Sequence, residues 1–294
     1  MTSHAETYTT ASDRANAVKD TLQQAETEAQ RMVRRRAQLI IFWRLAILVG
    51  VLGGWELFAS LHWIDPFFYS KPTLIAKQIY DWTMEGTSQG PLWLQVVVTL
   101  EETLIGFLIG GVAGVICGIL LGRNQFLADI FSVYIKVANS IPRVVLGSIF
   151  VIALGLGMAS KVALAVVMVF FVVFGNAFQG VREADRYMIA NAQILGASPR
   201  QVTMQVVIPS ALSWILASLH VSFGFALVGA VVGEFLGARE GIGLLISTAQ
   251  GAFNASGVFA AMIVLAVVAL IAEYILTYIE GRLLKWRPAQ FENA

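Results

Sequence analysis

Hydrophobic positions gather in six long runs that are separated by short polar stretches. The runs cover residues 39–60, 94–122, 126–157, 162–178, 211–236 and 258–278. About 20 apolar helical residues cross the hydrocarbon core of a bilayer, and lipid offers no hydrogen-bond partner to open backbone. The pattern therefore predicts an all-α integral membrane protein with six transmembrane helices. The third run is too long for one straight span and contains Pro142, which predicts a kink there.

The composition agrees with a membrane protein. Hydrophobic residues make up 57% of the 294 residues and charged residues only 13%, whereas charged residues are about a quarter of a soluble domain. A net charge of +1 argues against a nucleic-acid partner, which requires a basic face. The single cysteine, Cys117, and three scattered histidines provide no metal-ligand spacing, so we expect no metal site.

The Lys and Arg residues that flank the runs predict the orientation. Most of them fall on the side of the amino terminus, and only Lys71, Lys77, Lys161 and Arg239 fall on the other side. By the positive-inside rule, both termini are predicted to be cytoplasmic. Four segments follow. They are a cytoplasmic tail (1–38), the first span with an extracytoplasmic loop (39–91), a core of five helices (92–285) and a C-terminal cytoplasmic tail (286–294).

Glycines recur every fourth residue along the second run. Residues four apart lie on nearly the same helix face, so this face is almost bare backbone and another helix can approach it closely. Tight packing and sliding of helices during transport are both compatible with the pattern. The predicted packing glycines are Gly106, Gly110, Gly114, Gly118 and Gly122.

A polar stretch, "NAQILGASPRQVTMQVVIPS" (191–210), separates the fourth and fifth runs. Gly196 can end a first short helix, because glycine accepts the left-handed conformation found just past a helix end. Ser198 is suited to an N-cap, Pro199 to the first helical position and Gln201 to a capping box. Pro209 is expected to stop the second helix. The stretch therefore predicts two helices around a tight turn. It is either an ordinary connector or a docking surface for another protein.

The glycine and the proline thirteen residues after it, with Val206 and Ile208 between them, resemble the cytoplasmic loop signature of binding-protein-dependent ABC importer permeases. "NSIPRVVLGSIFVIALGLG" (139–157), "NAFQGVREAD" (176–185) and "GEFLGAREGIGLLI" (233–246) further resemble the branch that takes up nitrate, sulfonates, taurine, bicarbonate and heterocyclic precursors. The resemblance covers roughly residues 92–285. It implies a type I importer permease fold with an EAA-type cytoplasmic coupling loop at 180–211, in a bacterial inner membrane.

The resemblance also implies partners and roles. We expect two copies of an ATP-binding subunit that carries ATP and Mg, an extracytoplasmic solute-binding protein, and a second permease copy in a homodimer. This chain has no phosphate-binding loop and no cofactor of its own, and it is not expected to be an enzyme. The family's glutamate falls on Ala190, while Glu183 and Asp185 lie outside that register. The implied ATPase-coupling residues are Ala190, Asn191, Ala192, Gly196, Ala197, Ser198, Pro199, Arg200, Gln201 and Pro209.

Polar residues within the runs are candidates for the translocation pathway, because charge inside a bilayer is costly. Lys136 and Arg143 are seven residues apart, would share one face of a continuous helix, and would suit a small anionic solute. The other candidates are Asn139, Ser140, Asn176, His220 and Ser222. Glu101, Glu102 and Glu234 are interpreted either as docking points for a substrate-delivering protein or as charges that reach the membrane surface.

Two other functions were weighed against the importer permease. A secondary transporter or channel driven by an ion gradient would have paired inverted repeats with helices broken at matching positions. The sequence has one proline-containing run and no evident counterpart. An intramembrane enzyme would require a catalytic constellation at membrane depth, and none is evident. The importer permease is therefore the favoured prediction.

Overall fold

The computed structural model describes residues 11–184 and 186–283, most of which lie in helices. Two compact units divide at residue 64. The first contains α1 (Ala11–Ser60), whose part Arg31–Ser60 is long and apolar enough to cross a membrane. The second unit contains α2 (Pro66–Tyr69), α3 (Pro72–Met84), α4 (Leu92–Arg123), α5 (Gln125–Ser140), α6 (Arg143–Leu154), α7 (Met158–Arg182), α8 (Arg186–Ile194), α9 (Pro199–Val202), α10 (Ile208–Leu236), α11 (Ile242–Gly251) and α12 (Ala255–Leu283).

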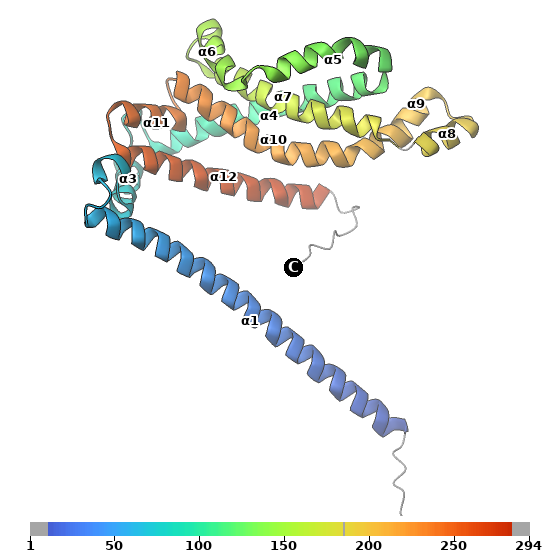
Figure 1. The fold of residues 1–294 in the computed structure, drawn as a ribbon, viewed down its shortest axis with the longest axis horizontal. Coiled ribbons are helices and arrows are strands. Elements are labelled where there is room, and N and C mark those ends of the chain that lie inside the picture. The colour runs from blue at the N-terminus through green and yellow to red at the C-terminus, as the bar shows by residue number, and fades with distance from the viewer. Residues whose placement is uncertain (1–10, 185, 284–294) are drawn as a thin grey trace, which may run out of the picture. The chain divides into compact units, whose positions relative to one another are not determined.

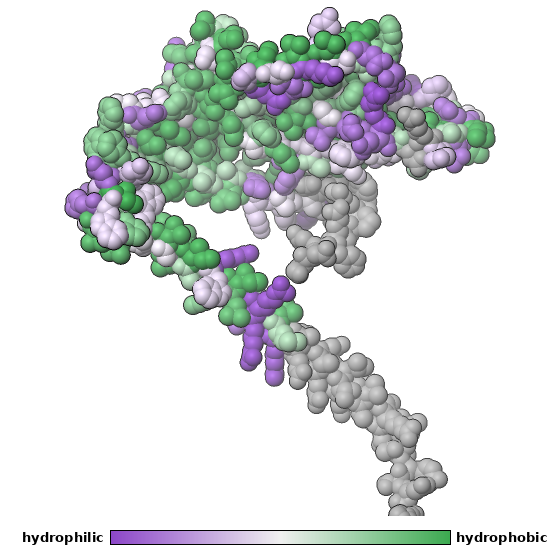
Figure 2. Space-filling model, in the orientation of Figure 1, coloured by the Kyte–Doolittle hydropathy of each residue, from purple (hydrophilic) through white to green (hydrophobic). Residues whose placement is uncertain are grey.

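Three long helices, α4, α7 and α10, lie side by side and form the centre of the second unit (Figure 1). The short helices α8 and α9 lie at one end of this bundle, and α3 and α11 lie at the other. We call these the α8 end and the α11 end. Apolar side chains cover much of the bundle surface (Figure 2), as expected for helices that face lipid.

The glycines of α4 allow its close contact with α7. A Cβ on Gly114 would lie 2.9 Å from the Phe170 carbonyl oxygen, and one on Gly118 would lie 2.6 Å from the Ala177 Cβ. Gly106, Gly110 and Gly122 face α7 residues in the same way. From Gly106 to Gly122, roughly four helical turns, the two backbones therefore pack directly against each other at the glycine positions.

The third predicted span is broken rather than kinked. Helix α5 ends at Ser140, α6 begins at Arg143, and the two axes differ by 86°. Ile141 is extended, as expected for the residue before Pro142. In the described residues, five helices are each long and apolar enough to cross a membrane, and the α5–α6 pair makes a sixth if it is counted as one span.

The prediction that Pro209 ends the second helix of the loop is wrong. The helical path continues from α9 through a π-helix (Thr203–Val207) into α10, and Ile208 is helical. The Ile208 amide donates to the Thr203 carbonyl, five residues back. This wider turn accommodates the proline ring, which would otherwise clash with the preceding turn. The fifth span therefore belongs to one helical segment that begins at Pro199.

Candidate functional site

The predicted capping box at the start of α9 is confirmed. The Ser198 amide donates to Gln201 Oε1 (2.8 Å), and the Gln201 amide donates to Ser198 Oγ (3.4 Å). Gly196 has a φ of +86°, the left-handed conformation in which only glycine is free of strain. The Ala197 amide donates to the Ala192 carbonyl (3.0 Å). These bonds fix the turn between α8 and α9.

One side of the loop is packed and the other is open. Ala192 and Ala197 contact a buried apolar cluster that includes Val202 and Val207 and that joins the loop to α7 and α10. In contrast, Ile194 is 82% exposed and Leu195 is 86% exposed. The remaining predicted coupling residues are exposed as well: Ala190, Asn191, Gly196, Ser198, Pro199, Arg200, Gln201 and Pro209. The α8 end therefore carries a rigid, partly apolar projection.

Glu183 lies just after α7 and not on the projection. It is exposed, and its Oε1 accepts a hydrogen bond from Gln179 Nε2 (2.6 Å). Asp185 lies outside the described residues. The residue at the family's glutamate position, Ala190, is exposed on α8. Glu183 is therefore engaged with its own helix, one turn back.

Four of the seven predicted pathway residues gather at the break between α5 and α6. Arg143 Nη2 donates to Asn139 Oδ1 (2.9 Å) across the break, and its guanidinium lies 5.2 Å from the centroid of the Phe171 ring on α7. Ser140 donates to the Lys136 carbonyl (2.9 Å), and the Lys136 side chain is exposed. Because the helix is broken, Lys136 and Arg143 do not share one continuous helix face.

The other three pathway candidates lie elsewhere. Asn176 Nδ2 donates to the Val172 carbonyl of its own helix (2.9 Å). Ser222 is fully buried and donates to the Ser218 carbonyl. His220 lines a cavity of about 240 Å³ between α10 and α12, together with Glu273. The seven residues therefore do not form a single site in the described part of the chain.

A buried polar cluster at the α11 end departs from the sequence interpretation. Glu234 is fully buried, so it neither reaches the membrane surface nor contacts a docked protein directly. Its Oε1 accepts from Thr99 Oγ1 (2.6 Å), and its Oε2 accepts from the Gly243 amide (2.7 Å). Lys161, interpreted as a flanking charge, is also fully buried and donates to the carbonyls of Leu156 (2.7 Å) and Gly157 (3.1 Å).

Backbone donors from the start of α11 complete this cluster. The Ile242 amide donates to Thr99 Oγ1 (2.9 Å), and the Gly241 amide donates to Gln95 Oε1 (2.7 Å). A Cβ on Gly241, which has a φ of +115°, would collide with the Glu234 carboxyl. The polar face of α4 and Glu234 of α10 thus hold the first amides of α11, which have no partner within their own helix.

A sequence signal for this cluster exists in retrospect. Gln95, Thr99 and Thr103 recur every fourth residue on α4, and Gly241 and Gly243 follow Glu234 closely. All three polar side chains on α4 are fully buried. Polar residues at helical spacing beside a carboxylate and two glycines are a pattern of helix-terminus capping in a membrane, where each backbone donor requires a protein partner.

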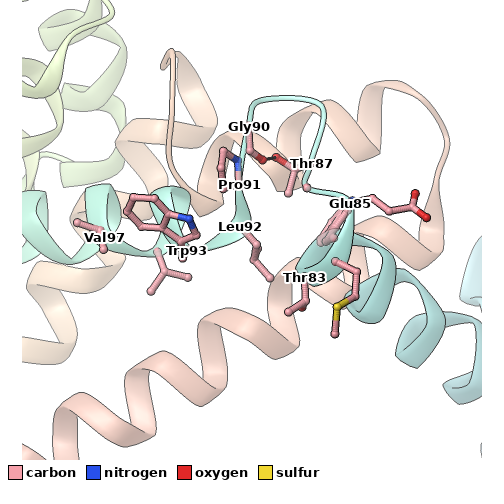
Figure 3. A pocket seen from close by; sticks show the side chains of 12 residues that line it. Thr83, Glu85, Thr87, Gly90, Pro91, Leu92, Trp93 and Val97 are labelled. Atoms are coloured by element: carbon pink, nitrogen blue, oxygen red, sulfur yellow. Dashed lines mark hydrogen bonds between the residues drawn. The ribbon is translucent and has the colours of Figure 1, made fainter.

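A cavity of about 630 Å³ lies beside the connection between α3 and α4 (Figure 3). Trp93 and Val97 approach it from α4, and Thr83 from α3. Thr87 Oγ1 donates to the Gly90 carbonyl (2.7 Å), which closes the connecting loop. None of the predicted pathway residues lines this cavity, so its lining gives no indication of a solute site.

The helical fold with several membrane-spanning helices is that of a transport permease subunit. Residues 110–285 match the family described as the binding-protein-dependent transport system inner membrane component. This match covers more than half of the chain, so the chain belongs to that family. It is the transmembrane permease component of an ABC importer, and the family is one of transporter permeases rather than enzymes.

Similar proteins support this assignment. A putative aliphatic sulfonates transport permease protein, SsuC, of Bacillus subtilis is 26% identical over 264 residues, which are 89% of this chain and 94% of that protein. The taurine transport system permease protein TauC of Escherichia coli is 28% identical over 243 residues, covering 82% and 87%. The inward-facing methionine ABC transporter MetNI has a similar fold, with a TM-score of 0.56, 20% identity, and coverage of 66% of this chain and 96% of that chain.

Proposed function

We propose that this permease carries a small anionic solute, delivered by a solute-binding protein, and that it couples to a separate ATPase through the loop at 180–211. Two copies of the chain form the pathway in a homodimer, and two ATP-binding subunits supply ATP and Mg. Both termini lie in the cytoplasm. The α8 end is therefore the cytoplasmic end, and the α11 end faces the binding protein.

The observation that carries this proposal is the exposed apolar tip of the coupling loop. Ile194 and Leu195 are more than four-fifths exposed, although the capping box and the left-handed Gly196 hold the loop in one shape. Exposed apolar side chains on a rigid support are typical of a docking site. Because α8 and α9 pack on the cluster that joins α7 and α10, a force applied to the tip reaches both helices.

The anionic character of the solute follows from two cations at the α5–α6 break. The Arg143 guanidinium and the exposed Lys136 ammonium lie on either side of the break. A positive charge at membrane depth is costly unless it has a function or a partner. The names of relatives for sulfonates and taurine agree with a solute that carries a negative group. Ligand identification on the cognate binding protein would test this part of the proposal.

The coupling role is tested by Leu195→Asp. Because Leu195 is 86% exposed, this change leaves the fold intact but places a charge where apolar contact with the ATPase is required. We expect the amount of ATPase that co-purifies with the permease to fall by about tenfold or more, as for a central interface residue. The measurement is co-purification from membranes in which both subunits are expressed.

The matched control is Phe253→Asp. Phe253 is 74% exposed, lies between α11 and α12 at the opposite end, and has a φ of +54°, which aspartate tolerates well. We expect it to retain the ATPase. Equal retention of the ATPase by both variants and the wild-type chain would contradict the coupling role of the loop.

A further inference from the structure

A third cavity, of about 400 Å³, opens at the α11 end between three segments. Glu101 and Glu102 line it from α4, and Arg239 and Glu240 from the connection between α10 and α11. The turn between α6 and α7, residues 156–158, forms the remaining wall. The lining therefore holds three carboxyl groups and one guanidinium. Its size falls at the lower end of the range for ligand pockets.

Glu102 is the buried carboxyl group among the residues that line this cavity. Glu102 is 3% exposed, and within the described residues its Oε2 accepts no hydrogen bond. A buried polar atom without a partner costs on the order of 1–3 kcal/mol, so an absent donor is expected there. Glu101, Arg239 and Glu240 are exposed at the cavity, so a charged group that enters from outside meets these side chains before it reaches the buried Glu102.

The surrounding charges favour a cation as the occupant. Glu102 lies next to Glu234, and among the described residues Lys161 is the only buried cation near both carboxyl groups. The Lys161 ammonium donates to two backbone carbonyls, those of Leu156 and Gly157. Carboxyl groups therefore remain in excess over cations around the cavity. Such a field attracts a positive group and repels an anionic solute.

We propose that this cavity receives a lysine or arginine side chain of the solute-binding protein, which donates to Glu102 and is steered by Glu101 and Glu240. The inference rests on the proposed function, because it requires a binding protein at the α11 end. The charge complementarity and the unsatisfied Glu102 oxygen identify the occupant as a hydrogen-bond donor that carries positive charge.

A side chain bound in the cavity would contact or lie next to residues that join α4, α7, α10 and α11. The same cavity touches the connection from α10 to α11, and Glu234, next to Glu102, accepts a hydrogen bond from the Gly243 amide in the first turn of α11. A cation that binds Glu102 also alters the balance of charge next to Glu234 and Lys161. Binding of the side chain would therefore change the electrostatic interactions among α4, α7 and α10, the three central helices of the bundle.

The first test uses the permease and its ATPase reconstituted in liposomes, with the cognate binding protein added outside. The quantity measured is the binding-protein concentration that gives half-maximal stimulation of ATP hydrolysis. We expect Glu102→Gln to raise it roughly tenfold, and Glu240→Gln to raise it less, because Glu240 is exposed. Arg239→Gln removes the opposing cation and should lower it, a gain that general damage to the fold does not produce.

The control variant is Glu85→Gln. Glu85 is exposed at the same end but lies outside the cavity, so the half-maximal concentration should stay that of the wild-type chain. The inference fails if Glu102→Gln, Glu240→Gln and Arg239→Gln all behave like this control, as expected if Glu102 is a neutral acid that donates to Glu234. If the wild-type complex itself is not stimulated by the binding protein, the proposed function fails instead.

A second test needs no binding protein. Glu240→Cys and Glu85→Cys, each in a Cys117→Ser background, are treated with positively and negatively charged methanethiosulfonate reagents. At equal ionic strength, the ratio of cationic to anionic modification rates should be several-fold larger at position 240 than at 85, and Glu102→Gln should reduce it. Equal ratios at the two positions would overturn the attraction of cations on which the inference depends.

Discussion

Substitution of one packing glycine, Gly110→Ala, measures how closely α4 and α7 depend on bare backbone. The added Cβ would lie 2.7 Å from the Val166 carbonyl oxygen and 2.9 Å from the Val169 Cβ, whereas ordinary contact begins at 3.4 Å. The first of these atoms is backbone, so no change of rotamer relieves the overlap. The helices must separate, and the tight contacts at Gly106 and Gly114 resist that separation.

The loss of stability expected for Gly110→Ala can be compared with the effect of a matched control substitution. Overpacking costs about 1–3 kcal/mol, while replacing glycine by alanine inside a helix gains about 1 kcal/mol. Gly175→Ala, on α7, has nothing within 4 Å of the new Cβ, so it should show the gain alone. The two variants should therefore differ by about 1–3 kcal/mol, the overpacking cost itself.

The assay is thermal unfolding of the purified protein in detergent, in which the quantity measured is the fraction of protein that remains monodisperse after heating. A difference of about 1–3 kcal/mol corresponds to an apparent melting temperature roughly 2–12 °C lower for Gly110→Ala than for Gly175→Ala. If Gly110→Ala is as stable as Gly175→Ala, the α4–α7 interface yields easily, and close packing is not what these glycines provide.

Two further variants address the helix termini. Ser198→Ala removes the acceptor of the Gln201 backbone amide at a cost of about 1 kcal/mol, so hydrogen exchange of the α9 amides should accelerate about fivefold. The control Ser210→Ala removes no cap and should leave this exchange unchanged. Identical exchange in the two variants would contradict the capping role. Glu234→Gln replaces one of the two buried carboxylate acceptors by a donor and should lower stability by about 1–3 kcal/mol, which is measured as faster hydrogen exchange of the α11 amides. Amide protection equal to that of the wild-type chain would show that the Gly243 amide does not depend on this carboxylate.

Local patterns in the sequence predicted the local structure well. The spacing of Gly106 to Gly122 indicated a bare helix face, and the order of Ser198, Pro199 and Gln201 indicated a capping box. Each depends on residues within a few positions of one another, where helix geometry alone decides what meets. Pro142 predicts a kink in the third run, but the helix is broken there, and the 86° bend depends on how α6 packs against α7 and α10.

Long-range contacts were beyond the sequence. Whether Glu234 reaches lipid headgroups or a buried site depends on Thr99, more than a hundred residues away. Lys161 is interpreted as a flanking charge because it lies between the third and fourth hydrophobic runs, yet it is buried. The prediction at Pro209 is wrong for a local reason, because a π-turn removes the clash that normally ends a helix, and no residue pattern in the stretch indicates a π-turn.

The uninterrupted path from Pro199 through the π-helix into α10 has a mechanical consequence. One helical segment carries the turn at Gly196 near one end and Glu234 near the other, about 50 Å apart at the rise of a helix. Because no break in the helical path separates them, an axial or rotational displacement of the turn moves Glu234 and, with it, the start of α11. If the turn docks on the ATPase as proposed, a flexible insertion between Val207 and Ala211 would leave both ends of the segment folded and still uncouple ATP hydrolysis from movement at the α11 end.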